Sequence, residues 1–241
     1  MNTQQLVLGL TPDQWIALSS IGTMAAVVVA LVAVFQERIR ALFNRPCLRV
    51  TVSTAAPYAQ KALVAYGNHR AQCYYFRLKV QNTGRAEAEG VELLASDLLE
   101  DDGTGHYTQS SRFLPMNLVW SHDRKISHSI SAGMFRFCDL GHIIDPAERP
   151  NFPGEDFIIT YADLFFKHDI TEEVVLSLDT EVQPLTSTHL LPAGRYKLRL
   201  LVGAKGLTTK RIEIDIDLKK QWRINQGEML SEGIALEMKN S

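Results

Sequence analysis

"GRYKLRLLV" (residues 194–202) and "KRIEIDIDL" (residues 210–218) decide the fold, because both alternate apolar and charged residues with the period of a half-buried strand. The apolar sets are Tyr196, Leu198, Leu200 and Val202 in the first stretch, and Ile212, Ile214 and Ile216 in the second. We predict an antiparallel hairpin closed by "GAKGLTT", with Arg195 facing Asp217, Lys197 facing Asp215 and Arg199 facing Glu213. Opposed charges contribute about 0.2–1 kcal/mol each, and a slip of one residue would turn every isoleucine to water.

The same alternation occurs in "YYFRLKVQNTG" (74–84), where "NTG" is typical of a turn. Further strands are predicted at 47–53, 90–96, 134–140, 156–162 and 173–182. Short strands joined by turn residues predict a mainly β fold, an elaborated antiparallel immunoglobulin-like β-sandwich over residues 47–220. We expect a loop-rich insertion at about 100–155, with "EDDGTG" (100–105) as a hairpin tip. We also expect a C-terminal tail, 221–241, that docks through Trp222 as a short helix and a strand.

Residues 15–35, "WIALSSIGTMAAVVVALVAVF", form an apolar stretch without a single charge. As a helix this stretch would be about 30 Å long, which matches the hydrocarbon core of a bilayer. The tail before it, 1–14, contains no Lys or Arg, whereas a cleavable signal has a positive region there. We therefore predict a transmembrane helix at 15–35, with a cleaved signal as the weaker alternative.

The basic residues of the juxtamembrane segment, 36–46, predict the orientation of this helix. Arg38, Arg40 and Arg45 follow the apolar stretch, and only Glu37 opposes them. The positive-inside rule places this side in the cytoplasm, so the N-terminus lies outside a bacterial inner membrane. The three cysteines at no metal-like spacing agree with a reducing compartment. The arginines are also predicted to contact anionic lipid.

Small residues recur every four positions within the apolar stretch, at Gly22, Ala26 and Ala30. Such spacing lets two helix backbones approach closely, so it indicates a homo-oligomer formed through the helix. The alternative is a stripe of small residues that faces lipid.

Groups capable of chemistry gather in the middle of the chain: His122, Asp123, His128, Cys138, Asp139 and His142. Metal binding or thiol catalysis would need several of these groups to converge, yet their spacing matches no established motif. In a strand at 134–140, alternation places Cys138 and Asp139 on opposite faces. We therefore predict no catalytic residue, no metal and no cofactor, with a metal-dependent hydrolase as an alternative.

"YYFRLKVQNTGRAEAEGVELL", together with "ISAGMFRF" and "LPAGRYKLRL", resembles bacterial immunoglobulin-like domains of the cell-adhesion-related type. Asn82, Gly84, Ala88 and Val91 match the pattern of a strand, a turn and a second strand. The resemblance implies a binding or spacer module without catalytic residues. The predicted cytoplasmic side and the long middle insertion depart from that family.

The 241 residues carry a formal net charge of −2, so nucleic acid is not an expected partner. The sequence predicts a non-enzymatic, membrane-anchored binding module whose cytoplasmic domain recruits a partner protein or senses a small ligand. Alternatives are an effector that clusters through its helix in a stress or phage-defence response, the hydrolase named above, and an envelope module that faces the periplasm.

Overall fold

The computed structural model describes residues 11–152, 172–184 and 186–239. The chain divides into two units, an N-terminal one that contains the helix α1 (Pro12–Phe43) and a second one that begins at Pro46. Each unit is described by itself. The strand predicted at 156–162 lies outside the described residues.

The helix α1 contains the predicted apolar stretch and continues beyond it. Its segment Asp13–Gln36 is long and apolar enough to cross a membrane, at about 36 Å for 24 residues. Large apolar side chains are exposed along it, among them Ile16, Val29 and Val34. An N-terminal helix that is long and apolar enough to span a membrane is therefore present.

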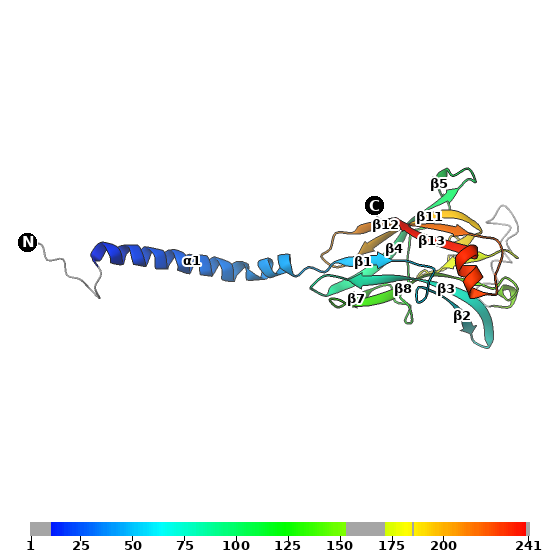
Figure 1. Ribbon diagram of the computed structural model, residues 1–241, viewed down its shortest axis with the longest axis horizontal. Coiled ribbons are helices and arrows are strands. Elements are labelled where there is room, and N and C mark those ends of the chain that lie inside the picture. Colours follow the sequence, from blue (N-terminus) through cyan, green and yellow to red (C-terminus); the bar gives the residue numbers. More distant parts are fainter. Residues whose placement is uncertain (1–10, 153–171, 185, 240–241) are drawn as a thin grey trace, which may run out of the picture. The chain divides into compact units, whose positions relative to one another are not determined.

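The first sheet is antiparallel and has the strand order β1-β3-β8-β9-β10; its strands β1, β2, β3 and β8 are labelled in Figure 1. Its strands are β1 (Leu48–Thr51), β2 (Ala59–Tyr66), β3 (His69–Asn82), β8 (Phe135–Ile144), β9 (Val175–Leu178) and β10 (Leu190–Pro192). β2 pairs with the first half of β3, and β1 pairs with its last four residues. The predicted strands at 47–53, 74–84, 134–140 and 173–182 thus all contribute to this sheet.

The second sheet is also antiparallel and has the order β13-β12-β11-β4-β5, with β6 and β7 paired to β4. Its strands are β4 (Ala88–Asp101), β5 (Tyr107–Gln109), β6 (Met116–Asn117), β7 (His128–Ile130), β11 (Gly194–Gly203), β12 (Lys210–Leu218) and β13 (Ile234–Lys239). Short helical turns are η1 (Arg149–Asn151), α3 (Gln226–Glu228) and η2 (Met229–Gly233).

One hydrophobic core joins the two sheets. Phe76 and Leu78 from the first sheet and Leu93, Leu198 and Ile214 from the second are fully buried in the same cluster. These are the apolar sets that the alternation predicts. The mainly β class with two antiparallel sheets is therefore confirmed.

The predicted hairpin of β11 and β12 is confirmed residue for residue, with Arg195 opposite Asp217, Lys197 opposite Asp215 and Arg199 opposite Glu213. The ion pairs follow a different pattern. They are Arg199–Glu213 (3.0 Å), Lys197–Glu213 (3.5 Å), Lys219–Asp217 (2.8 Å), Lys239–Asp215 (2.5 Å) and Arg195–Asp101. The predicted cross-strand ion pair therefore forms only for Arg199, because neighbouring strands and turns offer the other residues different partners.

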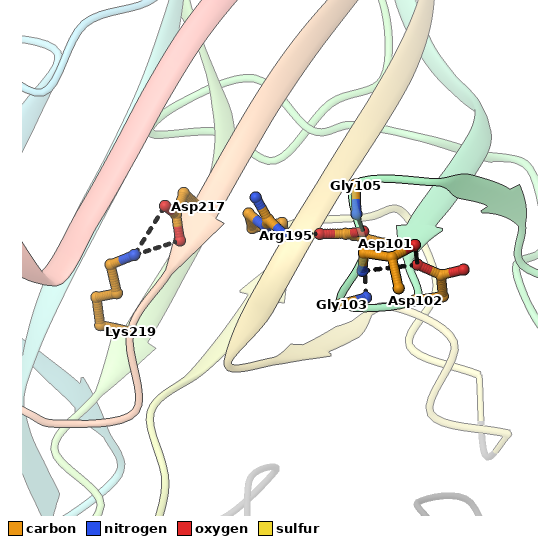
Figure 2. A network of polar contacts seen from close by, with 8 residues as sticks. Asp101, Asp102, Gly103, Gly105, Arg195, Asp217 and Lys219 are labelled. Atoms are coloured by element: carbon orange, nitrogen blue, oxygen red, sulfur yellow. Dashed lines mark hydrogen bonds and ion pairs between the residues drawn. The ribbon is translucent and has the colours of Figure 1, made fainter.

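The "EDDGTG" segment forms the tip of the β4–β5 hairpin, as predicted. Asp101 accepts hydrogen bonds from the backbone N–H groups of Gly103 (3.2 Å) and Gly105 (2.8 Å), and it also meets Arg195 (Figure 2). Asp102 accepts hydrogen bonds from the backbone N–H and the hydroxyl of Thr104. Both aspartates thus stabilise the turn itself.

The C-terminal segment forms short helical turns followed by a strand, as predicted, and the structure shows that this strand, β13, pairs with β12. Trp222 lies against the ring of Tyr74 with centroids 4.8 Å apart, and the Tyr74 hydroxyl donates to the carbonyl of Arg223 at 2.9 Å. Residues 100–155 hold the short strands β5 to β7 and also the long strand β8. Only part of the expected insertion is therefore irregular, because β8 is a central strand of the first sheet.

Candidate functional site

A cavity of about 300 Å³ lies on the outer face of the first sheet. Its lining residues are Gln60, Tyr75, Arg77, Ser121, His122, Arg124 and Asp139. The alternation of β3 explains this position, because Phe76 and Leu78 point into the core and their neighbours must then point outward. The polar side of β3 therefore forms the floor of the cavity.

A β-bulge in β8 shapes the site. Phe76 is opposite Gly141 and Arg77 is opposite Asp139, so that Leu140 is an extra residue in the ladder. Tyr75, two residues before Arg77, is consequently opposite His142. Regular alternation would place Asp139 and His142 on different faces, whereas the bulge turns both towards the outer face.

Gly141 lets β9 approach β8 at the bulge. A Cβ atom at this position would lie 2.4 Å from the backbone oxygen of Ser177, which is too close for any side chain. The glycine thereby allows the pairing of His142 with Ser177 and brings Asp179, just beyond β9, to the site.

The segment 118–127 forms the wall of the cavity. Trp120 bridges to Cys138, and Val119 both donates to the carbonyl of Asp179 (3.0 Å) and accepts from the backbone N–H of Asp139 (2.9 Å). The following turn has two residues in the left-handed region, with φ of 79° at His122 and 54° at Arg124. Such conformations cost about 1 kcal/mol or more in non-glycine residues and gather at functional sites.

Asp139 is a buried carboxyl group in this cavity, with 8% of its surface exposed. The Ser121 hydroxyl donates a hydrogen bond to its Oδ1 at 2.5 Å. Burial raises the pKa of Asp139, and the nearby Asp179 adds to this effect, while Ser121, Arg77 and Arg124 oppose it. Asp139 therefore takes up a proton more readily than an ordinary aspartate.

Asp179 behaves in the opposite way although it is more deeply buried, at 2% exposed. Burial alone would raise its pKa, but His142 and Arg124 outweigh burial and lower the pKa of Asp179. His142 Nδ1 lies 3.2 Å from Oδ2, and Arg124 Nη1 lies 3.6 Å from Oδ1. Two adjacent carboxyl groups with opposite pKa shifts are typical of functional sites.

Two arginines supply hydrogen-bond donors to the cavity. Arg77 donates from Nη2 to the carbonyl of Pro57 at 2.6 Å, and its guanidinium lies 4.8 Å from the ring centre of Phe137. Its Nε is buried and has no hydrogen-bond partner among the described residues. The Arg124 side chain is 58% exposed. Donors of this kind suit a ligand that carries a carboxylate or phosphate.

The central residues singled out from the sequence separate into four places, of which the hydrophobic core holds Cys138. His122 and Asp139 line the cavity, and His142 contacts Asp179 behind it. Asp123 and His128 form a pair of their own at 2.7 Å, outside the cavity lining. Among the residues that the structure describes, no three His, Cys, Asp or Glu side chains are grouped so that they could hold a metal ion.

Cys138 lies on the other face of β8, in the hydrophobic core, as the predicted alternation requires. Its thiol donates to the carbonyl of Val119 at 3.3 Å, and burial raises its pKa well above the ordinary value. Burial likewise raises the pKa of Cys73 to about 12. Both buried cysteines are therefore neutral thiols, which are poor nucleophiles.

Sequence reasoning missed Tyr75, Arg77, Arg124 and Asp179. The position of Tyr75 and Arg77 on the polar side of a predicted strand was a usable signal. Nothing local marks Asp179, which reaches the site only because β9 pairs with β8 at the bulge.

The residues predicted to act in the membrane all belong to the N-terminal unit. Gly22, Ala26 and Ala30 are exposed along α1, and a Cβ atom at Gly22 would meet nothing within 4 Å. Arg38 and Arg40 lie in the last turns of α1, and Arg45 follows the helix.

The fold thus defines a class of protein, in which an apolar N-terminal helix precedes a domain of two antiparallel sheets with a polar cavity. The chain matches no protein-family model, no curated protein and no solved structure.

Proposed function

We propose that this chain is a single-pass protein of the bacterial inner membrane whose cytoplasmic domain is a binding module for a small anionic ligand. In this proposal α1 crosses the membrane at 15–35, and the two-sheet domain is an immunoglobulin-like sandwich. The observation that carries the proposal is the cavity lined by Arg77, Arg124 and the buried Asp139, with a second buried carboxyl group, Asp179, in contact with Arg124.

The ligand's anionic group would bind between Arg77 and Arg124. Arg77 contributes the buried Nε donor, and Arg124 contributes an exposed guanidinium that lies 3.6 Å from Asp179. The side chains of Gln60 and Tyr75 extend the polar lining and select the remainder of the ligand. Asp139, with its raised pKa, would accept or share a proton with the bound group.

Ligand binding would also change the wall of the cavity. Arg124 sits in a left-handed backbone conformation, and its contact with Asp179 holds the turn that precedes it. A ligand that draws Arg124 away from Asp179 releases this contact and shifts the turn. In this proposal the shifted turn changes either the binding of a partner protein or the association of two copies of the chain through Gly22, Ala26 and Ala30.

The test uses the full chain in detergent and follows its thermal unfolding with phosphate, pyrophosphate, citrate and a set of nucleotides. At least one of these anions should raise the Tm in a dose-dependent manner, and Arg124→Ala should abolish the rise. Arg70→Ala is the matched control, because Arg70 is exposed on the same sheet and does not line the cavity. The proposal fails if no anion raises the Tm, or if both variants respond alike.

The membrane part of the proposal is tested separately. Reporter fusions at the C-terminus should be active only on the cytoplasmic side. Replacing Gly22 and Ala26 with leucine should reduce self-association of the helix in membranes. Unchanged self-association would contradict the proposed association of two copies through the helix, but it would not bear on the proposed ligand site.

A further inference from the structure

Cys47, the residue just before β1, is connected through Asn82 to the turn between β7 and β8. The Asn82 side chain accepts a hydrogen bond from the backbone N–H of Cys47 at 3.1 Å. The backbone N–H of Asn82 donates to the carbonyl of Met134, and Gly133 N–H donates to the carbonyl of Asn82, both at 2.9 Å. A single residue thus connects the point where the chain enters the domain with this turn, at the same end of the domain (Figure 1).

The turn presents two consecutive large apolar side chains to solvent. Met134 is 61% exposed and Phe135 is 46% exposed. Outside α1, the other exposed large apolar residues of the described chain are separate in sequence: Leu63, Leu114, Val182 and Ile224. Isolated examples are ordinary, but an adjacent exposed pair where the chain passes from β7 of one sheet to β8 of the other favours contact with an apolar phase.

Basic side chains lie on both sides of this pair. Lys79 Nζ lies 4.3 Å from the ring centre of Phe135, and Arg136, the next residue in β8, is exposed. Arg49, also exposed, pairs with Gln81, which in turn pairs with Phe135, so Arg49 lies in the same row across the sheet. We call Arg49, Lys79, Met134, Phe135 and Arg136 the tip surface. The nearby β3–β4 turn adds no net charge to the tip surface, because its Arg85 and Glu87 have opposite charges.

The length of the chain limits how far the tip surface can be from a membrane that α1 crosses. The candidate span ends at Gln36, and seven further helical residues reach Phe43, which adds about 10 Å. The few residues from there to Cys47 add about 14 Å at full extension. The headgroup layer is itself about 5–8 Å thick on each side. The tip surface is therefore within reach of the lipid headgroups.

We infer that the tip surface docks onto the anionic leaflet on the domain's side of the membrane. Met134 and Phe135 enter the interfacial layer, while Arg49, Lys79 and Arg136 bind lipid phosphates. Basic residues near such a surface are attracted to anionic lipid, and apolar tips flanked by basic residues are typical of interfacial contacts. This inference rests on the proposed membrane anchor and gives the domain a defined attachment to the lipid.

The test uses the full chain with Cys47→Ser, so that the exposed native thiol is removed while Cys73 and Cys138 stay buried. Met134→Cys, or Ile224→Cys as the control, is then labelled with an environment-sensitive fluorophore. Ile224 is 74% exposed and is not part of the tip surface. Each protein is reconstituted into vesicles of phosphatidylcholine with phosphatidylglycerol, with and without brominated lipid.

The label at position 134 should show a blue-shifted emission and a several-fold stronger quenching by brominated lipid than the label at 224. The difference should shrink in vesicles of phosphatidylcholine alone and in the Arg49→Ala, Arg136→Ala double variant. Equal quenching at both positions, in protein that withstands alkaline carbonate extraction, overturns the inference and leaves the anchor intact. Extraction of the protein by carbonate overturns both.

Discussion

Gly141→Ala is the substitution that most directly tests how the candidate site is assembled. The added Cβ would lie 2.4 Å from the Ser177 backbone oxygen, whereas carbon and oxygen atoms in contact are about 3.3 Å apart. Strands β8 and β9 must therefore separate by about 1 Å. A hydrogen bond at that place, from Asp179 N–H to the carbonyl of Leu140, is already 3.2 Å long and would be lost.

The expected loss of stability is about 3 kcal/mol. Overpacking of a buried position costs about 1–3 kcal/mol, and each lost backbone hydrogen bond adds about 1 kcal/mol. For a domain of this size the Tm should fall by about 6–12 °C. Urea unfolding of the full chain in detergent, followed by tryptophan fluorescence, measures the change, and Trp120 is a buried reporter beside the site.

Gly203→Ala is the matched control, because Gly203 also lies in a strand but its Cβ would meet nothing closer than Thr209 Oγ1 at 3.9 Å. This variant should be neutral or gain about 0.5 kcal/mol, since alanine restricts the unfolded chain more than glycine does. Equal free energies of unfolding for the two variants would refute the close approach of β8 and β9.

Three further predictions concern charge and burial. Asp139→Asn should raise the free energy of unfolding at neutral pH, because burial raises the pKa of Asp139 in the folded state and its ionisation therefore costs stability as the pH rises through that pKa. In denaturation experiments this gain should shrink as the pH falls towards the ordinary value of 3.8. A gain that does not depend on pH would contradict the prediction. Arg195→Ala should lower the free energy of unfolding in urea by about 2 kcal/mol, because it leaves the buried Asp101 without its cation. Asp217→Ala should lower it by less than about 0.5 kcal/mol, because the partner lysine of Asp217 is largely exposed. Equal losses would show that Asp217, which lies opposite Arg195 in the hairpin, is as important as Arg195. Cys47 should be alkylated in the native protein and the other two cysteines only after unfolding, as counted by mass spectrometry.

The candidate site shows where sequence reasoning stops. Alternation correctly placed Cys138 and Asp139 on opposite faces of the strand, and the structure shows that Cys138 faces the core. Alternation alone would have put His142 on the same side as Cys138, and only the bulge at Leu140 brings it to the outer face. A bulge changes the phase of a strand by one residue, and no periodic pattern marks it in advance.

The sequence by itself determined the apolar helix, the long strands β3, β4, β8, β11 and β12, and the register of the β11–β12 hairpin, but not β2. These features follow from how neighbouring side chains partition between water and an apolar phase, which is a local property with a period. Only the tertiary structure decided that Arg195 pairs with Asp101, and that Asp179 meets His142 and Arg124 beside the cavity. Those contacts depend on which distant strands become neighbours and on one extra residue in β8, Leu140. The pattern of a single segment predicts neither of these.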